Sequence, residues 1–302
     1  MAPAEVVVLG AAGLDTTVAV DGLDLETGES RFTSVVDGVG QAGGYAARIY
    51  AAAGRTVSFV GGIGADLAGE ELRRVLEIEG VDTSPSFPEP LGTARSVNLA
   101  LPDGRRRSFY DGRLGNGRPD SGLVGRLLAR ARLIHVNLPG WVRPLLPMAR
   151  SSGAVVACDL QDLPSPDDSY RSEFVRAADI LFFSAADLGE PDRAVRRLWE
   201  RNPDALVVAG LGGYGALLGL AGRITRHPAP EVDLPVVDTT GAGDSLAAGF
   251  LVAHVLQGRT PEEALARGQV TARHTCSLRQ PKAGFADPGT IEALLTAAAA
   301  RS

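Results

Sequence analysis

The sequence contains almost no lysine: of its 30 basic residues, only Lys282 is a lysine. A phosphate-binding loop of the Walker type needs Gly-Lys followed by Ser or Thr, so that kind of nucleotide site is excluded. Cysteine is nearly as scarce, with only Cys158 and Cys276, which excludes a disulfide framework and indicates a reducing compartment. The four histidines show no metal-ligand spacing.

The chain also has fewer basic than acidic residues. Acidic residues number 36, the formal net charge is −6 and the sequence pI is near 5.3, which argues against a nucleic acid or an anionic membrane as a partner. No apolar run is long enough to span a bilayer, and the first residues lack a signal-type pattern. We therefore expect a cytoplasmic protein that acts on small molecules.

Short β-rich runs alternate with helical patterns through most of the 302 residues. Buried strands separated by helices predict an α/β fold with a mostly parallel sheet covered on both faces. Expected strands are Val6–Gly10, Thr56–Val60, Leu133–Leu138, Ala154–Asp159, Ile180–Phe183 and Leu206–Gly210. Expected helices are 43–53, 66–79, 120–130, 141–151, 171–178, 188–200, 243–257, 261–278 and 289–300. Ligands collect at the carboxyl ends of such strands, where Asp159, Ser184 and Gly212 are expected.

Two stretches interrupt this alternation, about 15–37 and 93–113. Both read as extended segments with hairpin signals, Thr27-Gly28 in the first and Asp103-Gly104 in the second. We expect them to pair as a small β-sheet that forms a lid over the site of a single domain spanning 1–302.

The most informative motif is Asp238-Thr-Thr-Gly-Ala-Gly-Asp244, followed directly by an apolar helical pattern. Gly241, Ala242 and Gly243 allow a tight turn whose backbone N–H groups point one way at the start of a helix, which is a site for an anion. A carboxylate there would repel phosphate unless it had its own role, so we interpret Asp244 as a general base in phosphoryl transfer. The alternative is a glycine turn with Asp244 as a partner of the helix dipole.

These residues resemble the ribokinase-like (PfkB) family of carbohydrate and nucleoside kinases over nearly the whole chain. Besides the C-terminal motif, the resemblance includes Val60-Gly-Gly-Ile-Gly-Ala-Asp66 and Ala209-Gly-Leu-Gly-Gly-Tyr-Gly215. It implies a three-layer α/β/α doubly wound fold with a β lid. It also implies phosphoryl transfer from ATP and Mg²⁺ to an alcohol group of a sugar-like substrate, and a homodimer joined through the lid.

The resemblance also implies site residues. Asp15 would contact the substrate with Gly40, Gln41, Gly44, Tyr45 and Arg113. The nucleotide would be bound by Ser184, Gly210, Gly212, Gly215, Lys282 and Gly284, with Asp187 near Mg²⁺. Asp238 and Thr240 would either help to bind a monovalent cation such as K⁺ or stabilise the turn by side-chain hydrogen bonds.

Three positions depart from the family pattern. Tyr45 replaces a substrate-contacting asparagine, and its ring would either stack on a sugar or pack at the start of its helix. The usual Asn-x-x-Glu reads Ser184-Ala-Ala-Asp187, which shortens the carboxylate near the metal. Gly13 stands where ribose-type members carry asparagine, so ribose is disfavoured as the substrate.

Three other functions are compatible with part of the sequence. Gly38-Val-Gly40-Gln-Ala-Gly43 matches a dinucleotide fingerprint, but the next strand ends in Gly61-Gly62 instead of an acidic residue, which rejects an oxidoreductase. A nucleoside kinase of the same family and a catalytically weakened sugar- or nucleotide-binding protein remain alternatives to the sugar kinase.

Overall fold

The computed structural model describes residues 4–22, 31–101, 106–112, 115, 117–279 and 284–300. Within them, nine strands form one sheet in the order β15-β14-β13-β12-β11-β10-β1-β4-β6. Its strands are β1 (Val6–Leu9), β4 (Val57–Val60), β6 (Val81–Asp82), β10 (Leu133–Val136), β11 (Val155–Asp162), β12 (Ile180–Ser184), β13 (Leu206–Gly210), β14 (Ala216–Leu220) and β15 (Arg223–His227). The pairs from β6 to β13 are parallel, as the apolar strand pattern predicts.

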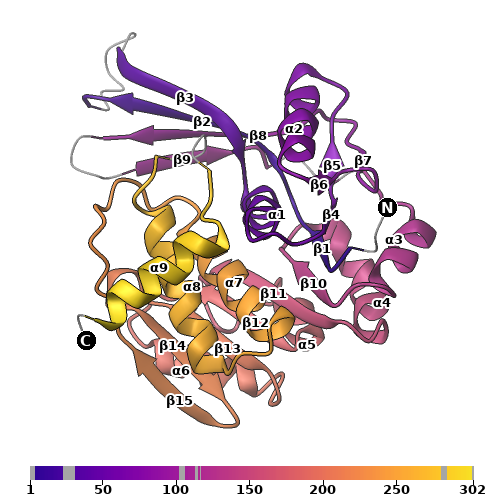
Figure 1. Ribbon diagram of the computed structural model, residues 1–302. Helices are drawn as coiled ribbons and strands as arrows, with labels where there is room; N and C mark the ends of the chain where they lie inside the picture. The colour runs from indigo at the N-terminus through magenta and orange to yellow at the C-terminus, as the bar shows by residue number, and fades with distance from the viewer. Residues whose placement is uncertain are drawn as a thin grey trace.

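Helices lie on both faces of this sheet, so that the architecture has three layers (Figure 1). The helices are α1 (Ala42–Ala52), α2 (Leu67–Ile78), α3 (Ser121–Leu128), α4 (Leu146–Ser151), α5 (Ser172–Ala177), α6 (Pro191–Trp199), α7 (Ala242–Leu251), α8 (Pro261–Thr275) and α9 (Pro288–Ala299), with short turns η1 (Gly140–Leu145), η2 (Gly212–Tyr214) and η3 (Val252–Leu256). One buried cluster joins one face of the sheet to α1, α2, α7 and α8, and a second joins the other face to α3, α4, α5 and α6. The predicted α/β class is confirmed.

Several features of the strands differ from the prediction, among them β6, which the sequence did not predict. Strands β14 and β15 continue the sheet in antiparallel fashion beyond β13, although the sequence predicted no strand there. Strand β11 continues past Asp159 to Asp162 through a β-bulge, and Gln161 in this bulge has φ of 56°. Strands β5 (Gly62–Ile63) and β7 (Phe87–Pro88) form a two-stranded parallel pair of their own.

A separate four-stranded sheet projects from the main body beside α1 and α2 (Figure 1). It contains β3 (Phe32–Gly40), β2 (Gly13–Val20), β8 (Ala94–Ala100) and β9 (Arg106–Tyr110), in that order. These strands come from the two stretches predicted to form a small sheet. The predicted turns at Thr27-Gly28 and Asp103-Gly104 lie outside the described residues.

The start of this sheet explains why residue 13 is glycine. Gly13 pairs with Ala94 on one side and Gly40 on the other. A Cβ at position 13 would lie 2.1 Å from the Ala94 carbonyl oxygen, so no larger residue fits at this crossing of β2 and β8. The glycine at this position is therefore required by strand packing, whatever the substrate.

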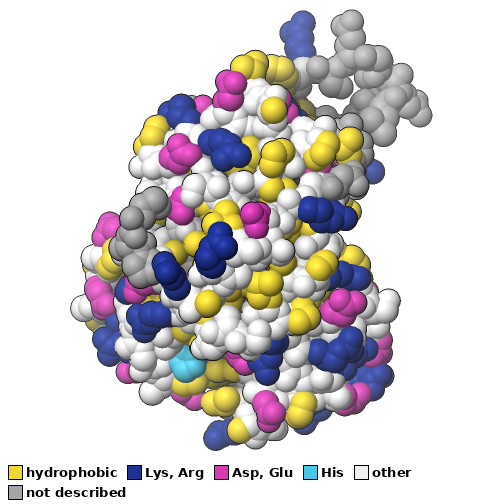
Figure 2. Space-filling view, turned by 90° about the vertical axis from the view of Figure 1, so that its right-hand side faces the viewer, with side chains coloured by type: hydrophobic (Ala, Val, Ile, Leu, Met, Phe, Trp, Pro, Cys, Tyr) yellow, Lys and Arg dark blue, Asp and Glu magenta, His cyan; other side chains and the backbone are white. Residues whose placement is uncertain are grey.

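The distribution of surface charge and the length of the helices are relevant to the kind of partner that the protein binds. On the face shown in Figure 2, arginine and acidic side chains are interspersed, with hydrophobic side chains between them. Of the helices in the described ranges, none combines the length and the apolar character that a membrane crossing would need.

A buried polar pair lies under the main sheet. The Tyr50 hydroxyl on α1 and Nδ1 of His135 on β10 are 2.9 Å apart, and both side chains are fully buried. Burial lowers the pKa of His135 from its ordinary 6.5 to about 4. The imidazole is therefore neutral at physiological pH, and its protonation is coupled to unfolding.

This pair predicts a loss of stability in mild acid. Because the folded pKa of His135 is depressed, the unfolded chain binds the proton first, and stability falls as pH drops from 6.5 towards 4. The loss is expected to reach about 3 kcal/mol, at 1.36 kcal/mol for each pKa unit. The double variant Tyr50→Phe/His135→Leu should lose this part of the dependence. Urea unfolding at several pH values measures it, and an unchanged slope between pH 6.5 and 4 would contradict the assignment.

Candidate active site

The carboxyl ends of the parallel strands lie at one edge of the main sheet. Asn137 follows β10, Asp159 lies near the end of β11, Ser184 ends β12 and Gly210 ends β13. Because neighbouring parallel strands end at the same edge, these residues line one border of the molecule. The predicted site residues Ser184 and Gly210 lie at this edge.

Asp15 on β2 is held by donors from three different segments. Its carboxylate accepts hydrogen bonds from the Ser96 hydroxyl at 2.5 Å, the Gln41 backbone N–H at 3.3 Å and the Tyr45 hydroxyl at 3.4 Å. Gly40 lies directly against it, since a Cβ at position 40 would be 2.0 Å from Asp15 Oδ2. Gln41 has φ of 63°, an uncommon conformation for a residue with a side chain. The predicted acceptor residues Asp15, Gly40, Gln41 and Tyr45 therefore lie together.

Asn137 was not predicted as a site residue. Its side chain is 1% exposed, yet neither its amide nitrogen nor its amide oxygen has a hydrogen-bond partner in the described residues. It lies against Gly10, because a Cβ at that position would be 2.3 Å from Asn137 Oδ1. A buried polar group normally has a partner, so this amide is a candidate donor and acceptor for a ligand. The signal available in the sequence was a polar residue inside a predicted apolar strand.

The start of α7 has the geometry expected of an anion site. Gly241 has φ of 75°, which turns the chain into the helix. The Ala242 N–H donates to the Thr239 carbonyl oxygen at 3.2 Å. Gly243 is exposed, and its N–H makes no backbone hydrogen bond to any residue that the structure describes. Of the three amides expected to receive the phosphoryl group, those of Ala242, Gly243 and Asp244, that of Gly243 is thus the one most open to an oxyanion.

Asp244 is half-buried in the first turn of this helix. Burial and the negative charges of Asp159 and Asp15 raise its pKa well above the ordinary value, although its own backbone N–H opposes the shift. Burial and the charge of Asp162 raise the pKa of Asp159 to about 6. Three carboxyl groups from β2, β11 and α7 therefore interact in one site, and Asp244 is a stronger base than a solvated aspartate.

This arrangement predicts how the activity depends on pH. Asp244 acts as a base only when it is ionised, and Asp159 and Asp15 are the charged groups that oppose its ionisation. Removing one of them with Asp159→Asn should lower the pKa of Asp244, so the acidic limb of the kcat/KM profile should move to lower pH. Initial rates across a pH series check this. A limb that stays in place, or moves up, would contradict the assignment.

Asp238 and Thr240 lie in the turn before α7. The Asp238 carboxylate accepts a hydrogen bond from the Thr240 N–H at 2.9 Å, and the backbone N–H of Asp238 donates to the Cys276 carbonyl oxygen at 3.1 Å. These bonds describe a side-chain-stabilised turn. Cation binding by the same residues remains a prediction.

The predicted nucleotide residues of β12 and β13 are adjacent. The Ala185 N–H donates to the Gly210 carbonyl oxygen at 2.8 Å, and a Cβ at Gly212 would lie 3.7 Å from the Ala186 side chain. Gly215 has φ of 99° and could not carry a Cβ, which would lie 2.1 Å from the His227 carbonyl oxygen. These contacts bring the glycine-rich turn after β13 next to the segment that contains Ser184 and Asp187.

Ser184 and Asp187 also line a cavity of about 310 Å³. Its remaining lining residues are Asp162, Leu163, Pro164, Arg171 and Leu188. Asp162 was not predicted, and it pairs in register with Ser184 because the β-bulge shifts the end of β11. The bulge therefore brings a second carboxylate to the cavity beside Asp187.

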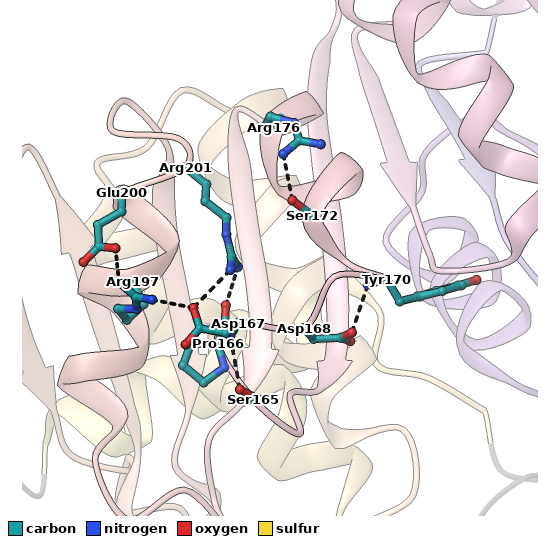
Figure 3. Close-up of polar contacts among 10 residues, drawn as sticks. All are labelled: Ser165, Pro166, Asp167, Asp168, Tyr170, Ser172, Arg176, Arg197, Glu200 and Arg201. Carbon is teal, nitrogen blue, oxygen red and sulfur yellow. Dashed lines mark hydrogen bonds and ion pairs between the residues drawn. The ribbon is translucent and has the colours of Figure 1, made fainter.

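The loop after β11 borders this cavity and is fixed by hydrogen bonds on two sides. Arg197 on α6 and Arg201 just after this helix donate to the Asp167 carboxylate at 2.7 and 3.1 Å, and Arg201 also donates to the Pro166 carbonyl oxygen (Figure 3). On the other side, the Tyr170 hydroxyl donates to the Leu138 carbonyl oxygen at 2.5 Å. We call residues 165–170 the braced loop.

Four further site residues were predicted, namely Gly44, Gly284, Arg113 and Lys282. Gly44 packs on Ala12, with 3.3 Å between a Cβ at position 44 and the Ala12 Cβ. Gly284 is exposed and precedes Phe285, whose ring contacts Tyr45. Arg113 and Lys282 lie outside the residues that the structure describes.

The three-layer fold, the separate small sheet and the glycine turn at α7 define a ribokinase-like kinase, a phosphotransferase with an alcohol group as acceptor. Comparison with known proteins agrees. Residues 3–286 match the model of the pfkB family carbohydrate kinases. The chain belongs to this family, whose members use ATP.

Individual relatives include two curated enzymes. The chain is 32% identical over 294 residues to an acarbose 7(IV)-phosphotransferase of Actinoplanes sp., covering 95% of this chain and 97% of that protein. It is 30% identical over 280 residues to an ATP-dependent ribose-1-phosphate kinase of Halopiger xanaduensis, covering 87% and 90%. Among solved structures, the microbiome-derived acarbose kinase Mak1 superposes with a TM-score of 0.88 at 30% identity, covering 97% and 99% of the two chains. These relatives support a sugar kinase.

Proposed function

We propose that this protein transfers the γ-phosphoryl group of ATP to a hydroxymethyl or other alcohol group of a sugar-like molecule, with Asp244 as the general base. The observation that carries the proposal is the start of α7, where an ionisable carboxyl of raised pKa follows the open N–H of Gly243. Asp15, whose charge acts on Asp244, supplies an acceptor-binding carboxylate in the same site.

In this mechanism, the Asp15 carboxylate accepts a hydrogen bond from the substrate and orients it. Asp244 takes the proton of the attacking hydroxyl as its oxygen forms a bond to the γ-phosphorus, and the bond from that phosphorus to the bridging oxygen of ADP breaks. The N–H groups of Gly243 and Asp244 would donate to the phosphoryl oxygens, with Ala242 contributing if its bond to Thr239 opens. Closure of the four-stranded sheet, as a lid, would exclude water from the site.

Magnesium is part of the proposal. Asp162 and Asp187 line one cavity with the Ser184 hydroxyl, and neither carboxylate has a side-chain hydrogen bond or ion pair within the described part of the chain. In those same residues, no three metal-ligating side chains gather. Two carboxylates that leave positions for phosphate oxygens and water fit Mg²⁺, which would neutralise phosphate charge when bound. We include K⁺ at Asp238 and Thr240 as a second cation.

The acceptor is proposed to be an acarbose-like oligosaccharide or a related cyclic polyol. The support is the 32% identity to an acarbose phosphotransferase along almost the whole chain, together with the departure from the ribose pattern at Tyr45. A nucleoside kinase remains the alternative, since a nucleoside kinase is also among the relatives, at 27% identity over 213 residues.

A phosphorylation assay tests the proposal. The purified protein is incubated with ATP and Mg²⁺ and with acarbose, maltose, ribose, ribose 1-phosphate or adenosine, and ADP release and phosphorylated product are both measured. Phosphorylated acarbose, with no more than background turnover of adenosine, is the expected result. Turnover of adenosine alone would favour the nucleoside kinase, whereas binding of ADP without turnover of any acceptor would identify a binding protein. Repeating ADP calorimetry with and without Mg²⁺ in Asp162→Asn and Asp187→Asn tests the metal residues independently of activity.

A homodimer through the four-stranded sheet completes the proposal. Asp15 and Ser96 point to one face of this sheet, and the side chains that alternate with them lie on the other, where exposed apolar residues stand beside Thr16, Asp37 and Arg107. The exposed apolar residues are Phe32, Val35, Val97 and Phe109. Such a surface on a sheet favours burial against a second copy.

The cytoplasmic location predicted from the sequence is retained, supported by free Cys158 and Cys276.

The dimer predicts that a charge in this surface separates the subunits. Phe109→Glu places a carboxylate in the apolar face and should convert a dimer to a monomer in sedimentation velocity. Tyr214→Glu, which changes an exposed aromatic residue outside this sheet, is the control. A wild-type protein that sediments as a monomer at all concentrations would contradict the dimer.

A further inference from the structure

Tyr45 contacts three separate parts of the site. Its hydroxyl donates to Asp15 Oδ2 at 3.4 Å, which ties it to the four-stranded sheet. Its ring lies against Gly241, where a Cβ would be 3.4 Å from the ring carbon Cδ1. The ring also meets Phe285 edge to face, with centroids 6.1 Å apart. One side chain thus joins the acceptor aspartate, the turn before α7 and the segment that follows Gly284.

These surroundings limit what the tyrosine can do. The side chain is 3% exposed, so the faces of its ring are covered by protein and stacking on a sugar would require the site to rearrange. Burial and the charges of Asp15 and Asp244 raise the pKa of Tyr45 well above its ordinary value. The phenol therefore stays protonated and serves as a hydrogen-bond donor. It cannot replace Asp244 as the base.

The contact between the Tyr45 ring and Gly241 affects the part of the site that would receive the phosphoryl group. Gly241 has φ of 75°, and this turn sets the direction in which the Gly243 N–H and the Asp244 side chain point. A glycine has no side chain to restrict its own conformation, so the turn depends on its neighbours for rigidity. The aromatic ring supplies a flat, buried surface against it.

The ring is itself fixed from the other side. The Arg48 guanidinium lies 5.1 Å from the Phe285 ring centroid and donates to the Glu79 carboxylate at 2.7 and 2.8 Å and to the Val39 carbonyl oxygen at 3.0 Å. Phe285 is therefore held between Arg48 and Tyr45. This packing places the tyrosine on a rigid support formed by α1 and the end of α2.

We propose that Tyr45 is a positioning residue. It holds the acceptor-binding Asp15 and the phosphoryl-receiving turn at Gly241 at a fixed position relative to each other. Its hydroxyl orients Asp15, and its ring holds Gly241. The two functions are separable by mutation, because one depends on a single oxygen atom and the other on the ring. The proposal rests on the proposed kinase function and adds a residue that acts through Asp15 and Asp244.

Two substitutions separate the two functions. Tyr45→Phe keeps the ring and removes the hydroxyl, so the KM for the acceptor should rise about 2- to 10-fold, the range for a single hydrogen bond, with kcat and the KM for ATP unchanged. Tyr45→Asn keeps a polar group but removes the ring, and kcat should fall about 10-fold or more because the turn is no longer held. Tyr45→Leu repeats the second test if the asparagine variant does not fold.

The matched control is Tyr50→Phe, one helical turn further along α1. Tyr50 is also buried and its hydroxyl also makes a hydrogen bond, but its partner is His135. This variant should be less stable than the wild type and have wild-type kcat and KM. If Tyr45 has only a structural role, Tyr45→Phe and Tyr45→Asn will behave like it, with lower melting temperatures and unchanged kinetic constants, and the proposal is overturned.

The result also distinguishes this inference from the proposed function. A wild-type protein that phosphorylates no acceptor would contradict the kinase proposal itself. A wild-type protein that is active, with Tyr45→Phe showing the wild-type acceptor KM or Tyr45→Asn retaining its kcat, would contradict only the role of Tyr45.

Discussion

Asp244→Asn is expected to lower kcat by about 10²- to 10⁴-fold, the range for removal of a general base. The amide has nearly the same shape as the carboxylate but cannot accept the proton of the attacking hydroxyl. Binding of ADP should be unaffected, because the Gly243 N–H and the turn before α7 remain. Single-turnover phosphorylation measures the loss, and calorimetry with ADP shows whether the site is intact.

The control for this variant is Asp204→Asn. Asp204 is exposed and precedes β13, at the edge of the main sheet opposite the active site. It should have wild-type kinetics. Asp244→Asn with wild-type kcat would contradict the assignment of the base, and equal losses in both variants would point to a general effect on the fold.

The same substitution is expected to make the protein more stable. The pKa of Asp244 is raised in the folded state by burial and by Asp159 and Asp15. An acid with a raised folded pKa contributes stability below its unfolded pKa and loses it as pH rises through the folded value. At pH 7 the variant should therefore melt above the wild type, by about 2–4 °C for each kcal/mol. The difference should vanish near pH 4, where both side chains are uncharged.

Gly40→Ala is the substitution expected to harm acceptor binding most. A Cβ at this position would lie 2.0 Å from Asp15 Oδ2, so the carboxylate must move away from Ser96 and from the substrate. Loss of a hydrogen bond to a charged group costs about 1.5–3 kcal/mol. The kcat/KM for the acceptor should accordingly fall about 10- to 100-fold, while the KM for ATP stays the same.

Gly122→Ala provides the matched control, since Gly122 lies in the first turn of α3, away from the site, and a Cβ there would meet the ends of the Asp120 and Arg126 side chains at 3.3 and 3.6 Å. Initial rates at varied acceptor and fixed ATP measure both variants. If Gly40→Ala retains the acceptor KM of the wild type, Asp15 does not bind the acceptor in the way proposed.

Most of the main sheet could be predicted from the sequence, because its strands are short, continuous apolar runs bounded by turn residues. Val6–Leu9 and Leu133–Val136 are completely buried, and no other structure suits such runs in an α/β protein. Strands β14 and β15 could not be found in this way. They form a hairpin at the edge of the sheet, where one face is partly exposed and glycines interrupt the apolar pattern.

The candidate site was predictable where a local motif determines its shape. The turn before α7 is an example, because glycine at 241 is needed for a positive φ. Residues that reach the site through long-range contacts were harder to recognise. Asp162 depends on a bulge that shifts β11 against β12, and the burial of Asn137 depends on how closely Gly10, directly after β1, approaches it. Neither contact leaves a pattern in the local sequence.

The braced loop has a thermodynamic consequence for ligand recognition. Its conformation is already fixed by side chains on and just after α6 and by the Tyr170–Leu138 hydrogen bond, so a ligand in the adjoining cavity would lose little affinity to the ordering of this border. The conformational entropy lost on binding should then be concentrated on the opposite side, where the four-stranded sheet meets the acceptor.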